Sequence, residues 1–221
     1  MPAFWTPIFQ NHFQRFFQKP FDVQVFHSPD HYALKVATYD WGLPGFRVYA
    51  SLGLADLVER SERETIGEII LCVDIADAEV QRIFVHALFT ILQHDVPLDA
   101  RFAIGFAGMS PAFARRHNRT ALYVTRSLKL DSRFDEIKSD DDSARVFQAF
   151  FLAPEEDEFL ANQGSHEFEK RFWPPFGEEL YDDELSALPE TPEEEAERTK
   201  KTQEKKKLAM SSLSIRRPLC V

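Results

Sequence analysis

Seven histidines are the residues most able to bind a metal ion, and their spacing keeps them apart. They are His12, His27, His31, His86, His94, His117 and His166. His27 and His31 flank a proline turn, an arrangement that does not make a zinc site. His86 and His94 share one expected helix, but eight residues, or about two turns, is too far for one ion. We therefore expect neither a metal site nor a metal cofactor.

Nucleophilic and acid–base catalysis have equally little support. Ser110 follows Gly108 in a small-residue turn, but the second glycine of a nucleophile elbow does not come two positions later. Cys72 lies inside an apolar segment, where a thiolate is unfavourable. The acids between positions 59 and 68 alternate with arginines, which indicates surface ion pairs. No glycine pattern matches a phosphate-binding loop. We expect no catalytic residue, no cofactor and no enzymatic activity.

Residues 46–74 hold the two strands around which the other elements are expected to pack. Residues 46–52 are aromatic and β-branched, and residues 67–74 are almost continuously apolar. A run this apolar is typical of a strand covered on both faces, so 67–74 is expected at the centre of a sheet with helices packed on it. A charged loop is expected between the two strands.

Hydrophobic periodicity predicts the other elements. Helices are expected over 6–19, with Thr6 as N-cap, and over 77–94, where Asp77 is the N-cap candidate. Strands are expected over 21–26, 31–39, 101–107, 121–128 and 146–152. A helix should begin at Pro154 and end near Gly164, with a short helix after it. The first half then reads as a helix followed by an antiparallel meander.

The charge pattern divides the chain into two parts. Residues 178–197 contain ten acids and no base, and residues 198–217 contain eight bases and one acid. Such runs cannot bury an apolar face. We therefore expect an α/β domain over 1–177, and over 178–221 a tail that is largely disordered or a solvated helix.

The overall composition excludes several classes of partner. The net charge of −10 argues against nucleic acid. No apolar run approaches the roughly 18 residues that span a bilayer, and the N-terminus does not resemble a secretory leader, so no membrane association is expected. We expect a cytoplasmic protein. Aromatic strands without recognisable chemistry favour a protein-interaction module, for example through strand addition at an exposed sheet edge.

Three segments resemble the suppressor of fused family. They are VYASLGLAD at 48–56, GEIIL at 67–71 and VFQAFFLAPEE at 146–156, with Ala55 in place of the family's usual serine. The resemblance implies an α/β (α+β) fold with a mixed, largely antiparallel sheet flanked by helices. It is to the single-domain bacterial members, some of which are thought to be immunity proteins. It also implies partner contacts at Tyr49 and Asp56, unless Tyr49 packs in the sheet and Asp56 caps a turn.

These observations lead to one main hypothesis and two alternatives. The main hypothesis is a non-enzymatic protein-interaction domain of the suppressor of fused type, an immunity or regulatory protein that binds and neutralises a protein partner. Its acidic surface favours a basic partner. One alternative is an enzyme whose site joins His31, Asp56 and Glu68. The other is a structural subunit that dimerises through an exposed Phe9, Phe13 and Phe17. The oligomeric state is left open.

Overall fold

The computed structural model describes residues 4–40, 46–60, 66–126, 132–139 and 142–172. The chain divides into two compact units, Met1–Arg171 and Phe172–Val221. Apart from Phe172, the second unit lies outside the described residues, as does the expected charged tail. The expected boundary between residues 177 and 178 and the character of the tail stay predictions.

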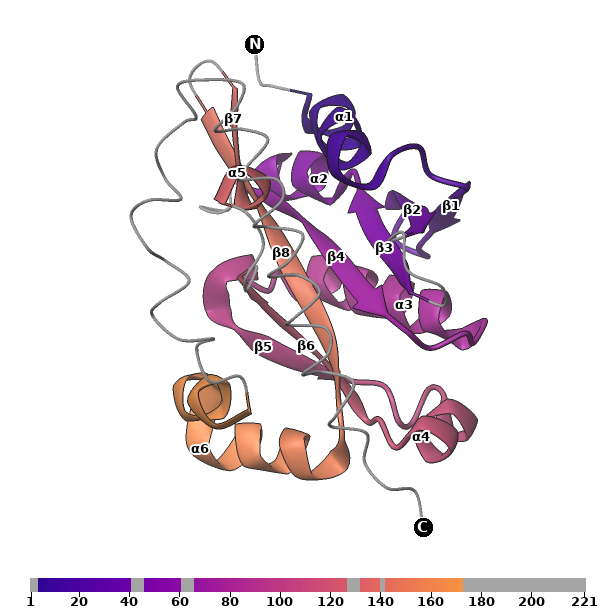
Figure 1. Ribbon diagram of the computed structural model, residues 1–221, viewed down its shortest axis with the longest axis vertical. Coiled ribbons are helices and arrows are strands. Elements are labelled where there is room, and N and C mark those ends of the chain that lie inside the picture. The colour runs from indigo at the N-terminus through magenta and orange to yellow at the C-terminus, as the bar shows by residue number, and fades with distance from the viewer. Residues whose placement is uncertain (1–3, 41–45, 61–65, 127–131, 140–141, 173–221) are drawn as a thin grey trace, which may run out of the picture. The chain divides into compact units, whose positions relative to one another are not determined.

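Eight strands form one mixed sheet, in the order β1-β2-β3-β4-β8-β6-β5, with β7 paired to β8 (Figure 1). The strands are β1 Asp22–His27, β2 Ala33–Asp40, β3 Arg47–Leu52, β4 Gly67–Val73, β5 Phe102–Gly105, β6 Ala121–Arg126, β7 Glu136–Ser139 and β8 Asp142–Leu152. Strands β4 and β8 run parallel, and each other pair is antiparallel. The predicted mixed, largely antiparallel sheet and the N-terminal meander are confirmed.

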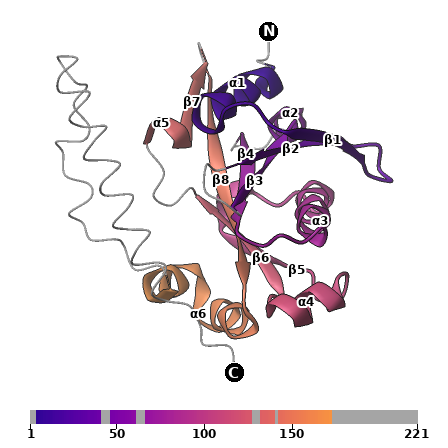
Figure 2. The ribbon, with the colours of Figure 1, turned by 45° about the vertical axis from the view of Figure 1, so that its right-hand side comes forward.

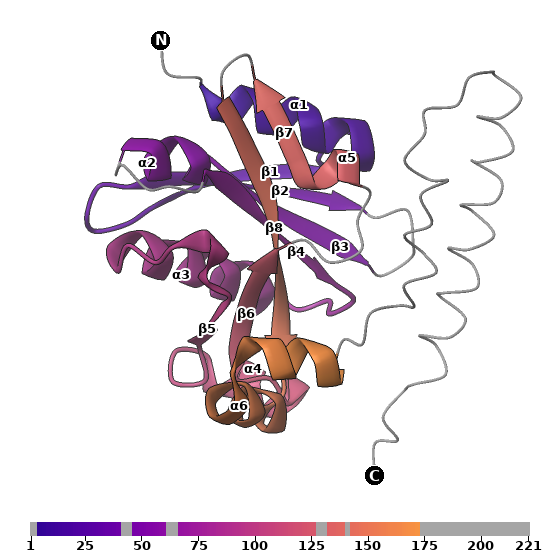
Figure 3. The same ribbon diagram turned by 90° about the vertical axis from the view of Figure 1, so that its left-hand side faces the viewer.

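Helices cover both faces of this sheet. They are α1 Trp5–Phe17, α2 Leu54–Arg60, α3 Glu79–Gln93, α4 Pro111–His117, α5 Ser132–Asp135 and α6 Pro154–Phe172, with a short 3-10 turn at Leu98–Ala100. Figure 3 shows α1 and α3 on opposite sides of the meander. No helix of the described chain is long and apolar enough to cross a membrane.

Strand β4 lies between two apolar clusters because its side chains alternate between the faces of the sheet. Ile69 and Leu71 pack in the cluster formed with α3, whereas Ile70 packs in the cluster formed with the aromatic side chains of α1. The prediction that this apolar run is a central strand covered on both faces is therefore confirmed. The apolar stripe predicted for the segment that forms α3 is likewise buried. In α1, Phe9 and Phe13 are buried, whereas Phe16 is 41% exposed.

Four short elements differ from the sequence-based expectation. The expected charged loop after β3 begins with helix α2, and helix α4 lies where only a turn was expected. Residues 132–139, for which no helix or strand was expected, form α5 and β7. Three helices were missed: α2 and α4 have seven residues each and α5 has four, which is too short to establish a hydrophobic period. The expected break at Gly164 is present as a kink in α6, with φ at 80°.

Candidate functional site: the outer edge of strand β1

The carboxylate of Glu68 on β4 fixes the turn between β3 and α2. It accepts hydrogen bonds from the Ser51 hydroxyl and from the backbone N–H groups of Gly53 and Ala55, the latter two at 2.7 and 3.1 Å. Gly53 permits this turn because its φ is 104°, in the region that favours glycine. Burial raises the pKa of Glu68 to about 7, against the opposing effect of these hydrogen bonds. The buried acid therefore has a structural role at this turn.

Asp56 on α2 caps a helix that is distant in sequence. Its carboxylate accepts hydrogen bonds from the backbone N–H groups of Trp5 and Thr6, at 2.7 and 3.2 Å, and from the Thr6 hydroxyl. The prediction that Thr6 is the N-cap of α1 was wrong: Phe4 occupies that position and offers no side-chain cap. Asp56 replaces the missing local cap. A contact between Asp56 and a partner stays a prediction.

Tyr49 and His31 are not among the described hydrogen-bond partners of Asp56 and Glu68. Tyr49 is 4% exposed and packs in the cluster formed with α3, so its contact with a partner also stays a prediction. His31 is exposed in the turn between β1 and β2. Asp56 and Glu68 each bind their own set of donors. The described contacts therefore do not join His31, Asp56 and Glu68 in one site.

Phe9, Phe13 and Phe17 of α1 do not offer the exposed dimer surface that one alternative requires. Phe9 and Phe13 are fully buried, and Phe17 packs partly buried against the same cluster. The rings of Phe13 and Phe17 contact Tyr39 of β2, with centroids 6.5 and 5.6 Å apart. This aromatic stripe belongs to the core beneath α1.

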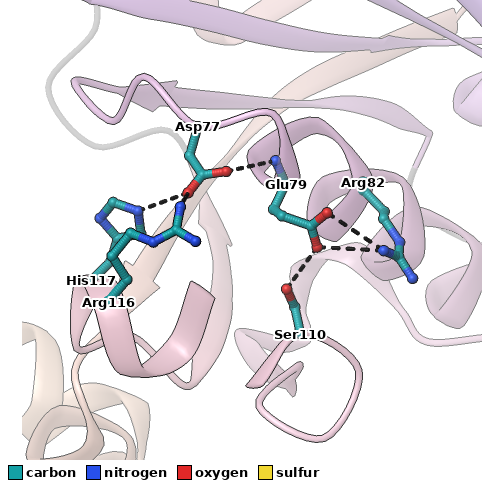
Figure 4. A network of polar contacts seen from close by, with 6 residues as sticks. All are labelled: Asp77, Glu79, Arg82, Ser110, Arg116 and His117. Carbon is teal, nitrogen blue, oxygen red and sulfur yellow. Dashed lines mark hydrogen bonds and ion pairs between the residues drawn. The ribbon is translucent and has the colours of Figure 1, made fainter. Parts of the chain in front are cut away.

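A polar network joins α4 to the start of α3 (Figure 4). Asp77 accepts hydrogen bonds from the backbone N–H of Glu79 and from His117 Nε2, both at 3.0 Å, and it pairs with Arg116 at 2.6 Å. Ser110 donates to Glu79 at 2.8 Å. The bond from the Glu79 N–H, followed by that from His117, lowers the pKa of Asp77. Because Ser110 and His117 bind different acids, the network does not form a Ser–His–Asp triad. Its contacts hold two helices together.

Cys72, the apolar-segment thiol, shows no sign of activation. Burial raises its pKa to about 12, so the thiolate form is disfavoured. The side chain packs partly buried against the cluster beneath α1. This agrees with the expectation that a thiolate is unfavourable at this position.

Strand β1 lies at the margin of the sheet and pairs with β2 on one side only, within the described residues (Figures 1 and 2). In an antiparallel pair of strands, every second residue is hydrogen-bonded to the partner strand. The bond from Ser28 N–H to Tyr32 O, at 2.9 Å, shows which residues of β1 these are. Even-numbered residues of β1 therefore bond to β2. The N–H and C=O groups of Val23 and Val25 point outward, where a further strand would pair with them.

The side chains of β1 make this margin apolar as well. Val23 and Val25 are 45% and 52% exposed, and they share the face of Ala37 and Lys35, their neighbours on β2. Phe26 points to the opposite face and packs against the cluster formed with α3. We use "the β1 edge" for the outward backbone groups of β1 together with the Val23 and Val25 side chains.

The other margins of the sheet are protected in ways that β1 is not. Strand β7 exposes Glu136 and Lys138, charges of the kind that discourage pairing. Strand β5 has only four residues. Strand β1 has six residues and neither a proline nor a Lys, Arg, Asp or Glu between its ends. An exposed edge strand without charges between its ends is a template for pairing with another chain.

The sequence predicted the strand but not its position at the margin. The alternation over 21–26 indicated a half-buried strand, and period two cannot tell which face is exposed. Val23 to Phe26 contains neither a charge nor a proline, so the sequence carried none of the features that ordinarily mark a solitary edge strand.

Comparisons with known proteins identify the fold. No protein-family model matches the chain, and no curated protein matches it in sequence. A solved structure named as a homolog of SUFU, the suppressor of fused protein, from Neisseria gonorrhoeae is similar with a TM-score of 0.55 and 13% identity. The similarity covers 83% of this chain and 91% of that one. A chain of the Sufu–Fu complex is similar with a TM-score of 0.50 and 13% identity, over 76% and 83% of the two chains. This protein therefore has the fold of a suppressor-of-fused-like domain, as its sequence motifs predict.

Proposed function

We propose that this chain is a non-enzymatic protein-interaction domain of the suppressor of fused type, and that an extended segment of its partner adds as a strand at the β1 edge. The observation that carries the proposal is the exposure of Val23 and Val25 on a strand whose outward backbone groups have no strand beside them in the described chain. One of the similar folds is named as part of a protein complex, which supports binding as the role of this fold.

Strand addition supplies affinity and selectivity through different groups. Backbone hydrogen bonds to Val23 and Val25 bind any extended segment, and the alternating side-chain positions select its sequence. Two exposed valines on one face favour a segment with β-branched or aromatic residues at every second position.

The charge of the chain indicates the remaining chemistry of the partner. A net charge of −10 attracts a basic protein and accelerates its association. By covering the bound segment, the domain acts as an immunity or regulatory protein that neutralises its partner in a bacterial cytoplasm. Contacts at Tyr49 and Asp56 belong to the same proposal, but the core packing of Tyr49 and the helix capping by Asp56 give the β1 edge more support as the site.

Two matched variants test this function. In affinity capture from the native host, the wild type should retain one stoichiometric basic protein, and Val23→Lys/Val25→Lys should lose at least about 90% of it, a tenfold or roughly 1.4 kcal/mol effect. The control Ala161→Lys/Gln163→Lys adds the same charge at exposed positions of α6 and should retain the partner. Thermal melting checks that all three proteins are folded. Equal capture by both variants would remove the β1 edge as the site.

A second variant separates the residues named by the resemblance. Tyr49→Ala/Asp56→Ala should lower the melting temperature, since it opens the core and uncaps α1. Loss of the partner at an unchanged melting temperature would instead support direct contact by these residues.

A further inference from the structure

The β1 edge has the properties that pairing with itself requires. We infer that a second copy of this chain docks there, with its β1 strand antiparallel to the first about a two-fold axis at Gln24. The inference uses the edge named in the proposed function, but it needs no foreign partner. Two-fold pairs are the commonest soluble homo-oligomers, and both copies then contribute the same surface.

The backbone limits which registers can form. Rotation about an axis normal to the sheet does not exchange the two faces of the sheet. Because residues paired across two strands point to the same face, odd-numbered residues pair with odd-numbered residues. The outward groups of β1 are at odd positions, as the bond from Ser28 N–H to Tyr32 O requires. An axis at Gln24 therefore places Val23 opposite the second copy's Val25. Each such pair exchanges two hydrogen bonds, about four across the axis.

The same register joins four valines on one face. Val23 lies beside Ala37 and Val25 beside Lys35, so each row across the junction contains two valines between Ala37 of one copy and Lys35 of the other. An axis at Val25 would instead place Val23 opposite His27. The axis at Gln24 therefore covers more apolar surface than the axis at Val25.

An axis at Val23 is disfavoured by the backbone. It would set each Val25 opposite Phe21, whose N–H already bonds to Thr38 O at 3.0 Å. Phe21 could then accept a bond from the second strand but could not donate one. The register centred on Gln24 keeps both bonds in each valine pair.

Charges do not oppose this arrangement at short range. Asp22 is the one acid of β1, and an axis at Gln24 separates the two copies of it by four residue steps, about 13 Å along the strands. That separation exceeds the Debye length of about 8 Å at physiological salt. The remaining repulsion is that between two chains of net charge −10.

The area of the contact sets the strength of the dimer. A six-residue strand covers less than the roughly 1,600 Å² of a standard stable interface. The pair is therefore weak and concentration-dependent. Since it uses the outward groups of Val23 and Val25, it competes with a foreign strand for the same edge.

Sedimentation velocity over a concentration series tests the dimer. The weight-average mass of the wild type should rise above the monomer mass of 25.6 kDa toward twice that value. Val23→Lys/Val25→Lys should weaken the dimer at least about tenfold, and Ala161→Lys/Gln163→Lys should leave it unchanged. A wild type that stays monomeric throughout would overturn the inference. So would a dimer that the valine substitutions leave intact.

Crosslinking tests the register directly. In a background with Cys72→Ser and Cys220→Ser, Gln24→Cys places two thiols at the axis in a non-hydrogen-bonded pair, where Cα atoms lie about 4.5 Å apart and a disulfide can form. Mild oxidation should crosslink Gln24→Cys far more than Lys138→Cys on β7. Equal yields would overturn the register. Partner capture is measured separately, so failure of the dimer and failure of the proposed function remain distinguishable.

Discussion

At the scale of single residues, Glu68 joins β4 to the turn between β3 and α2, and its substitution should weaken the whole domain. Glu68→Gln replaces one acceptor oxygen with a donor that faces the Ser51 hydroxyl or the backbone N–H groups of Gly53 and Ala55. Leaving a buried donor without its acceptor costs about 1 to 3 kcal/mol. Urea denaturation should show this loss in the free energy of unfolding, and Glu158→Gln, at an exposed site on α6, should show almost none.

The pH dependence of unfolding should report the same carboxyl group. Burial raises the folded pKa of Glu68 to about 7, above its value of about 4.3 in an unfolded chain. The folded state therefore holds this proton more tightly. The resulting stability is fully present below about pH 4.3 and is lost as the pH rises through about 7. The wild type should lose on the order of 3 kcal/mol more than Glu68→Gln between those values. Equal slopes for the two proteins would show that burial does not control this titration.

Residue contacts were the least predictable level from sequence. Asp56 and Glu68 were named as candidate site residues from the sequence. The groups that donate hydrogen bonds to their carboxylates could not be predicted. Asp56 binds Trp5 and Thr6 from about 50 positions away, whereas capping rules read only neighbouring residues. Thr6 matched the local rule and was therefore predicted as the N-cap of α1. The capping acceptor is instead the carboxylate of Asp56.

At the scale of elements, the capping of α1 by Asp56 makes that helix depend on α2. Asp56→Ala removes the acceptor for the N–H groups of Trp5 and Thr6, at a cost of about 1 to 2 kcal/mol. Native-state hydrogen exchange should then accelerate in α1 and change little in α3. Glu158→Ala, at an exposed acid of α6, is the control. Uniform acceleration throughout the domain would mean that α1 does not open separately.

Elements were predictable where their side-chain period was long enough to be read. The segments that form α3 and β4 have clear apolar patterns, and both were assigned correctly. Helices α2 and α4 are too short for such a pattern, and β7 exposes charged residues that resemble a loop. The parallel pairing of β4 with β8 could not be predicted from local pattern because its paired residues are 78 positions apart in the sequence.

At the scale of the whole molecule, the net charge of −10 should make the two uses of the β1 edge respond oppositely to salt. Two copies of an acidic chain repel each other, whereas a basic partner is attracted. Raising the ionic strength from about 0.1 M to about 1 M shortens the Debye length from about 10 Å to about 3 Å and weakens both effects. The dimer should therefore tighten with salt while the association rate of the partner falls. Sedimentation velocity and stopped-flow association in sodium chloride measure the two responses. A dimer that weakens with salt would mean that opposite charges hold it together, contrary to an apolar pairing at Val23 and Val25.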